Sequence, residues 1–354
     1  ADEWALASAS EYAWRGLSLL PIDGTTLRVP DSNGNAAEFG LPGSSRGRAG
    51  YPQVRLVTIM SAVTHMVACA AFGPCRGKRT GELSLARDLR ERVPPASLLI
   101  GDKLFLAFAE LYAITRRNTT DTASARHWLV PARKNTVWTV VERVSDTDAI
   151  VDLKVNSRDR RDDPSLPETM RVRAISYTRK GFRTRTLLTS LLDAQAYPGH
   201  EIAAVFRLRE EIELAHDELK THMLERQEAL RSKLPAGVRQ EIWGILAAYN
   251  LVRHKMLGVA KEACLHPLRI SFRHTLQALR LSWLVAAWTT QTTQLTNKGG
   301  LLRVMIALLI LPERRPHRYY RRHVKIKRSS YPRNPGRRRH GDAITAKPQE
   351  KPAI

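Results

Sequence analysis

The chain has 354 residues, 43% of them apolar, and a formal net charge of +23 from 57 Lys and Arg against 34 Asp and Glu. This length and composition allow one large or two ordinary buried cores, which excludes a disordered protein, and the basicity indicates a polyanionic partner such as nucleic acid. Three cysteines without zinc-type spacing exclude a disulfide framework.

The sequence does not predict a membrane anchor. Its longest uncharged apolar run near the end, residues 304–312, is far shorter than the roughly 20 residues that span a bilayer. No signal-peptide pattern opens the chain. From the three cysteines, which form no disulfide framework, we expect a protein of the reducing cytoplasm. The first residue is Ala rather than Met, from which we expect a fragment or a processed product.

The first strand of the chain leads to an acid. Residues 1–16 have helical composition, and the apolar run 17–22 predicts a buried strand that stops at Asp23-Gly24. An acid at a strand end places a carboxylate at the rim of a sheet, within reach of a ligand; a simple Asp-Gly turn is the alternative. Residues 33–50, rich in Gly, Ser and Asn, predict a loop.

A second acid follows a second strand. Residues 54–61 and 65–72 favour β structure around a short polar break, which predicts a hairpin. An amphipathic helix is expected at 82–93, and the short apolar run 97–100 then leads to Gly101-Asp102. A helix at 104–117 and a strand at 127–131 complete this part.

The remaining segments differ in character. Residues 132–197 are β-rich, with four Val-, Thr- and Arg-rich runs at 136–144, 149–155, 170–177 and 182–191. Helices are expected at 201–224, 238–263, 270–289 and 301–311. Residues 313–340 contain twelve Lys and Arg and one acid, so we expect a disordered basic tail over 313–354.

The helix expected at 201–224 carries a mixed stripe. At about 100° per residue, Phe206, Arg209, Glu213 and Lys220 fall within an arc of roughly 60°. Considered alone, such a stripe is more often a solvated helix surface, here with ion pairs from Arg209 and Lys220 to Glu213 and Glu218. Apolar residues on another side of the helix provide a packing face.

Three acids on separate elements suggest a metal site. Asp23, Asp102 and Glu213 supply the oxygen ligands that Mg²⁺ prefers. Two divalent ions about 3.5 to 4 Å apart activate the attacking oxygen and stabilise the leaving oxygen in phosphodiester chemistry. The three carboxylates therefore predict cleavage or transfer of phosphodiesters.

These residues resemble those of the DDE transposases of bacterial insertion sequences, the insertion-sequence-4 family. The third acidic motif of that family has the pattern Y-x2-R-x3-E-x6-K, which Phe206, Arg209, Glu213 and Lys220 match with Phe in place of Tyr. Asp23-Gly24-Thr25 is similar to the first motif, and Asp102-Lys103 to the second. The resemblance extends from about residue 14 to about residue 323.

The resemblance implies an α/β fold: an RNase H-like core with a β-rich insertion between the second and third acids, followed by a helical C-terminal region. The expected segments are 1–131, the first part of the core; 132–197, the insertion; 198–312, the catalytic helix and helical C-terminal part; and 313–354, the tail. The resemblance further implies an enzyme that cuts transposon ends and joins them to target DNA. Such an enzyme would act as a homodimer on double-stranded DNA in the bacterial cytoplasm and nucleoid.

The resemblance also implies roles for site residues. Asp23, Asp102 and Glu213 would hold two Mg²⁺ ions, or Mn²⁺ in their place, and Arg209, Lys220, Phe206 and Lys103 would contact DNA or its phosphates. Trp128 and Trp138 flank the start of the β-rich segment, where an aromatic ring either stacks on a base from the transposon end or packs in the core.

The chain also departs from the family pattern. Phe206 lacks the Tyr hydroxyl, Lys103-Leu104 replaces Arg-Gly, and only about twenty residues precede Asp23, where the family has an N-terminal DNA-binding region. Two alternative functions therefore stay open: a truncated or decayed copy that only binds DNA, and a related nuclease that cuts without joining.

Overall fold

The computed structural model describes residues 2–44, 47–48, 50–78, 80–118, 122–178, 182–225, 229–288, 303–304, 306–308 and 310–311. The chain divides into two units, Ala1–Pro312 and Glu313–Ile354, and every described residue belongs to the first. The expected basic tail lies outside the described residues, as does part of the helix expected at 301–311.

A nine-stranded sheet forms the centre of the described part, in the order β5-β4-β1-β6-β7-β11-β10-β9-β8. Its first five strands are β5 (Val67–Pro74), β4 (Gln53–Met60), β1 (Ser18–Arg28), β6 (Ser97–Ile100) and β7 (Arg126–Pro131). β5, β4 and β1 pair antiparallel, whereas β1, β6 and β7 pair parallel. The expected hairpin is confirmed as β4 and β5.

The β-rich segment extends this same sheet. Its strands are β8 (Trp138–Ser145), β9 (Asp148–Lys154), β10 (Thr169–Tyr177) and β11 (Arg185–Thr189), with α5 (Ser157–Asp162) between β9 and β10. β11 pairs antiparallel with β7, so the segment continues the sheet beyond its parallel strands. Inside it, a buried ion pair joins Arg173 of β10 to Asp148 of β9, with Nη2 2.5 Å from Oδ2.

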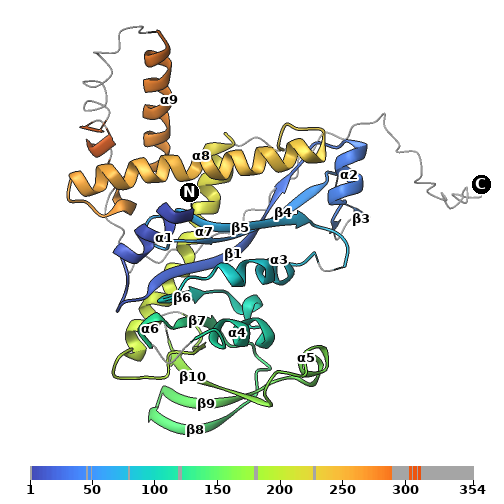
Figure 1. Ribbon diagram of the computed structural model, residues 1–354, viewed down its shortest axis with the longest axis vertical. Helices are drawn as coiled ribbons and strands as arrows, with labels where there is room; N and C mark the ends of the chain where they lie inside the picture. Colours follow the sequence, from blue (N-terminus) through green and yellow to red (C-terminus); the bar gives the residue numbers. More distant parts are fainter. Residues whose placement is uncertain are drawn as a thin grey trace, which may run out of the picture. The chain divides into compact units, whose positions relative to one another are not determined.

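Helices cover both faces of the sheet (Figure 1). They are α3 (Glu82–Leu89) and α4 (Phe108–Thr115) on one face, and α6 (Gly199–Phe206), α7 (Glu210–Asp217) and α8 (Pro235–Glu262) on the other. Successive strand residues point to opposite faces. Leu20 therefore packs in the cluster of α3 and α4, and its neighbour Leu19 in the cluster of α6. The described unit is a mixed α/β fold.

Shorter elements surround these layers. They are α1 (Asp2–Glu11), α2 (Asn33–Phe39), β2 (Gly43–Ser44), β3 (Gly47–Arg48), α9 (Phe272–Trp288) and the 3-10 turns Arg90–Arg92, Lys103–Phe105, Thr122–Ser124, Arg207–Arg209 and Pro267–Arg269. In Figure 1, α9 turns away from the long α8. None of the helices described here has the length and apolar character needed to cross a membrane.

Two expectations for the first fifty residues are wrong. The strand that contains Asp23 does not stop there, because β4 pairs with β1 from Ile22 opposite Ile59 as far as Arg28 opposite Gln53. The Asp-Gly pair therefore lies inside a strand and forms no turn. Residues 33–50 are not simply a loop, since α2 forms there with the Ser32 side chain capping its first turn through the Asn35 N–H.

The expectation of a single α-helix at 201–224 is also wrong in detail. It consists of α6, the 3-10 turn Arg207–Arg209, α7 and a π-helical turn, Glu218–Met223. Because 3-10 turns are tighter and π turns wider than an α-helix, the expected stripe is not straight. Phe206 ends α6, and Lys220 lies in the π turn.

Candidate active site

Two of the predicted acids lie at the same level of the sheet, one in a strand and one just after its parallel neighbour. β1 and β6 pair parallel with Pro21 opposite Ile100, and Asp23 and Asp102 each follow two residues later. Adjacent strands lie about 4.8 Å apart, and residues two apart share a face. The sheet therefore brings Asp23 and Asp102 together on the face that α6 and α7 cover.

The first acid is held in a partly buried, negatively charged setting. Asp23 is 20% exposed at its side chain, and its Oδ1 accepts a hydrogen bond of 2.8 Å from the Gly24 N–H. Burial raises the pKa of Asp23 to about 6; the charges of Asp102 and Glu82 add to the rise, while the Gly24 hydrogen bond and Arg209 oppose it. The positive charge near Asp23 is therefore too small to offset the cost of burying its ionised carboxylate.

The second acid shapes the chain that follows it. Asp102 Oδ1 accepts from the Leu104 N–H at 2.7 Å and so caps the 3-10 turn Lys103–Phe105. Arg133 fixes the same turn from the β-rich segment, donating to the carbonyls of Lys103 and Leu104 at 2.8 and 2.9 Å. The helix expected from residue 104 begins at Phe108 instead.

Glu82 is a neighbouring acid that sequence reasoning missed. It begins α3 and packs directly over Gly24, where a Cβ atom would lie only 2.4 Å from the Glu82 Cδ. This close approach explains why Gly follows Asp23 in the strand. The available signal was the acid at the first position of a predicted helix, which reads as ordinary helix capping.

Arg209 connects the third acid, Glu213, to the first acid, Asp23. The Arg209 guanidinium lies between Asp23 and Glu213, with Nη1 3.8 Å from Asp23 Oδ2 and Nη2 2.6 Å from Glu213 Oε1. Glu213 is 56% exposed and turned toward Arg209. Among the described residues, no group of three His, Cys, Asp or Glu side chains is close enough to hold one metal ion.

The other residues of the motif have distinct surroundings. Phe206 is buried in the apolar cluster with Leu98 and Ile100, beneath the ends of the parallel strands. Burial lowers the pKa of Lys220. The charge of Arg28 lowers it further, while the charge of Asp217 raises it. The alternative of solvated ion pairs holds in part: Arg209 pairs with Glu213, whereas Glu218 pairs with Arg253.

A cationic cleft adjoins Asp102. It has a volume of about 550 Å³ and its charged and aromatic lining residues are Asp102, Lys103, Arg133, Lys134, Trp138, Arg185, Phe206 and Arg209. Five of these side chains are cationic and one is anionic, so the cleft suits a polyanion. Arg133, Lys134 and Arg185 come from the β-rich segment, and sequence reasoning did not single them out.

The structure separates the two tryptophans. Trp128 is fully buried in the cluster beneath α3 and α4, so core packing is confirmed for it. Trp138 begins β8, is partly exposed and lines the cationic cleft. Only Trp138 of this pair is therefore placed to meet a ligand.

Sequence comparisons point to one kind of protein. A family profile described as "Transposase DDE domain" matches residues 14–251. The Escherichia coli (strain K12) protein "Transposase InsG for insertion sequence element IS4" is 36% identical over 250 residues, 70% of this chain and 54% of that protein. InsZ of the same organism is 32% identical over 130 residues, 36% of this chain and 41% of InsZ. The chain thus spans about half the length, or less, of these curated relatives.

A solved structure with a distant likeness is the piggyBac transposase synaptic complex with hairpin DNA. It is 11% identical, with a TM-score of 0.44, and the match covers 84% of this chain and 58% of that one. A likeness at this level assigns neither fold nor function.

Proposed function

The chain belongs to the transposase DDE domain family, and we propose that it is a DNA transposase that cuts transposon ends and joins them to target DNA with the help of divalent metal ions. The observation that carries the proposal is the arrangement of Asp23, Asp102 and Glu213. Asp23 in β1 and Asp102 just after the parallel strand β6 lie level with each other, and Arg209 links the third acid to the first.

The strand order supports an RNase H-like core. β5, β4 and β1 form an antiparallel meander, and β6 and β7 follow β1 in parallel. That order places one acid in the central strand and one just after its parallel neighbour. The β-rich segment would be an insertion into this core that adds four strands to its sheet.

The donor atoms suit Mg²⁺ or Mn²⁺. Asp23, Asp102 and Glu213 would hold the metal, all through carboxylate oxygens, and the raised pKa of Asp23 shows a carboxylate that a nearby cation would stabilise. When bound, two such ions activate an attacking oxygen and stabilise a leaving one. An exposed i,i+4 ion pair is worth only about 0.3–0.5 kcal/mol, so Glu213 can leave Arg209 at little cost.

The cationic cleft would hold the DNA strand beside these acids. Lys103, Arg133, Lys134 and Arg185 would contact phosphates, which position the strand without reading its sequence. Arg209 would do the same once Glu213 turns to the metal. Trp138 offers a ring on which an unpaired base can stack. Phe206 would act by packing beneath the parallel strands.

We further propose that two copies of the chain act together on double-stranded DNA, in the bacterial nucleoid. Joining two transposon ends to one target requires two active sites, and a net charge of +23 favours concentration of the protein on DNA.

The test is strand transfer by single variants. Asp23→Ala, Asp102→Ala and Glu213→Ala should each abolish Mg²⁺-dependent cleavage and joining while DNA binding is kept. Asp152→Ala is a matched control, because Asp152 is an acid that pairs with Arg171 in the β-rich segment. Normal joining by any of the three site variants would refute the assignment.

The products distinguish the alternatives. Joined DNA excludes a nuclease that only cuts, whereas cut ends that never join would support it. Salt-sensitive binding without cleavage in Mg²⁺ or Mn²⁺ would identify a chain that only binds DNA.

A further inference from the structure

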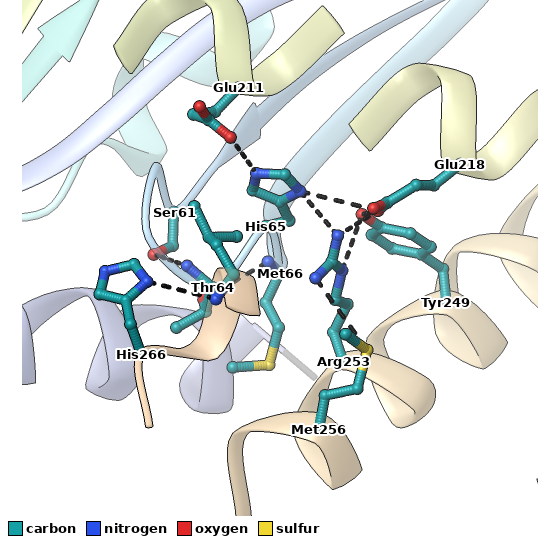
Figure 2. Close-up of polar contacts among 11 residues, drawn as sticks. Ser61, Thr64, His65, Met66, Glu211, Glu218, Tyr249, Arg253, Met256 and His266 are labelled. Carbon is teal, nitrogen blue, oxygen red and sulfur yellow. Dashed lines mark hydrogen bonds and ion pairs between the residues drawn. The ribbon is translucent and has the colours of Figure 1, made fainter. Parts of the chain in front are cut away.

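A buried polar network lies on the side of α7 away from the candidate active site. His65, in the turn between β4 and β5, has Nε2 3.0 Å from Glu211 Oε2 and Nδ1 2.7 Å from Arg253 Nη2. Arg253 of α8 pairs with Glu218, whose Oε2 also accepts from the Tyr249 hydroxyl at 2.8 Å. Figure 2 shows His65 between Glu211 on one side and Glu218 and Arg253 on the other.

The hydrogen bonds in this network have fixed directions. A guanidinium only donates, so Nδ1 of His65 accepts from Arg253, and Nε2 carries the proton that it donates to Glu211. His65 has a φ of 59°, in the left-handed region that non-glycine residues rarely adopt. Such a conformation persists where surrounding contacts determine it, and here both ring nitrogens are engaged.

Stability alone does not account for these charges. Burial raises the pKa of Glu218, but the neighbouring Arg253 guanidinium outweighs it and brings the pKa to about 2. Arg253 is itself only 3% exposed. Buried ion pairs are often replaceable by apolar residues of similar volume without loss of stability, because desolvation offsets their attraction. Apolar replacements, however, make no directional hydrogen bonds, so they would not fix the orientation of the helix in the same way.

The network contacts the helix that carries the third acid, Glu213. Glu211 lies in α7, and Glu218 begins the π-helical turn that continues it. The two residues are seven apart, about two helical turns, so they lie on the same side of this continuous segment, whereas Glu213 lies about 200° around the helix from Glu211. The π-helical turn that contains Lys220 begins at Glu218. A rotation of α7 that released the network would therefore also turn Glu213 away from Asp23.

We propose that Glu218, Arg253 and His65 are positioning residues, which set the rotation of α7 and so aim Glu213 and Arg209 at Asp23. The inference rests on the proposed function of that site. A second polar contact has the same effect: His216 Nε2 lies 2.9 Å from the Thr58 hydroxyl of β4. Burial, with Lys220 nearby, lowers the pKa of His216 to about 4, so the contact does not add a buried charge at neutral pH.

The test replaces the ion pair by apolar side chains of similar length. The double variant Glu218→Met with Arg253→Met removes both charges together, so neither is left buried alone. Its stability is measured by urea unfolding, its affinity for Mn²⁺ alone by electron paramagnetic resonance, and its Mg²⁺-dependent cleavage at saturating DNA. Lys261→Met is the control, since it removes an ion pair of α8 with Glu11, on the α1 side.

We expect the double variant to fold with some loss of stability, because the Tyr249 hydroxyl and His65 Nδ1 lose buried partners. It should bind DNA normally and lose about tenfold or more in Mn²⁺ affinity and cleavage rate, the loss typical of groups that orient metal ligands. The Lys261→Met variant should match the wild type. A double variant that folds and keeps both its Mn²⁺ affinity and its cleavage rate would overturn the inference.

Should the double variant not fold, Tyr249→Phe gives the same decision, because it deletes only the hydroxyl that donates to Glu218. A slower cleavage rate for folded Tyr249→Phe would support positioning, and an unchanged rate would overturn it. Asp23→Asn in the same assays separates the two hypotheses. If it keeps Mn²⁺ binding and cleavage, the proposed function fails, whatever the network variants show.

Discussion

Removal of the Asp23 charge should stabilise the protein in the absence of metal. Burial and the neighbouring carboxylates raise the pKa of Asp23 from 3.8 to about 6. The native state therefore binds more protons than the unfolded chain between these pH values, and stability falls as the pH rises through this window. A shift of about two pK units corresponds to about 3 kcal/mol at neutral pH. The Asp23→Asn variant avoids this loss.

The assay is urea unfolding of the wild type and Asp23→Asn in EDTA between pH 4.5 and 7.5. The variant should be the more stable protein throughout, and its advantage should grow by about 2 kcal/mol over this range. Titrating groups that do not interact with Asp23 are common to both proteins and cancel in the difference. A variant less stable than the wild type at pH 7.5, or an advantage that is constant with pH, would refute the reasoning.

Further substitutions test the packing around the site. Gly24→Ala should lower the free energy of unfolding by about 1–3 kcal/mol, because its Cβ would lie 2.4 Å from the Glu82 Cδ; adding Glu82→Ala should restore most of the loss, as urea unfolding would show. Trp128→Ala should cost about 3–5 kcal/mol, since the side chain is fully buried. Trp138→Ala should cost less, about 1–2 kcal/mol, because its partly exposed ring packs against the edge of the same cluster, and it should weaken binding of single-stranded DNA, measured by fluorescence anisotropy; equal destabilisation by both Trp variants would contradict the placement of Trp138 in the cleft.

The sequence located the acids because each signal was local. Apolar runs predicted the strands that carry Asp23 and lead to Asp102, and motif spacing singled out Glu213. The course of β1 beyond Asp23 could not be predicted, since it depends on pairing with β4, some thirty residues along the chain. A strand forms where a turn was expected because a distant strand pairs with it, and local residue propensity carries no information about such pairing.

Other features join residues that are far apart in the chain. The alternative of solvated ion pairs assigned Glu218 to a cation of its own helix, but its buried partner is Arg253 of α8. Sequence patterns favour exposed positions for charged residues, so a buried network of His65, Glu218 and Arg253 had no local signal. The cleft cations Arg133 and Arg185 were missed for a similar reason, because only the pairing of β11 with β7 brings Arg185 near Arg133, which follows β7.

The most direct test of the central claim maps the metal itself. With Fe²⁺ in place of Mg²⁺, ascorbate and peroxide generate hydroxyl radicals that cut the chain beside the bound ion. If Asp23, Asp102 and Glu213 form one metal site, cuts should fall near all three residues and should disappear together in the Asp23→Asn variant. Cuts confined to one of these segments, or a pattern unchanged by Asp23→Asn, would contradict it.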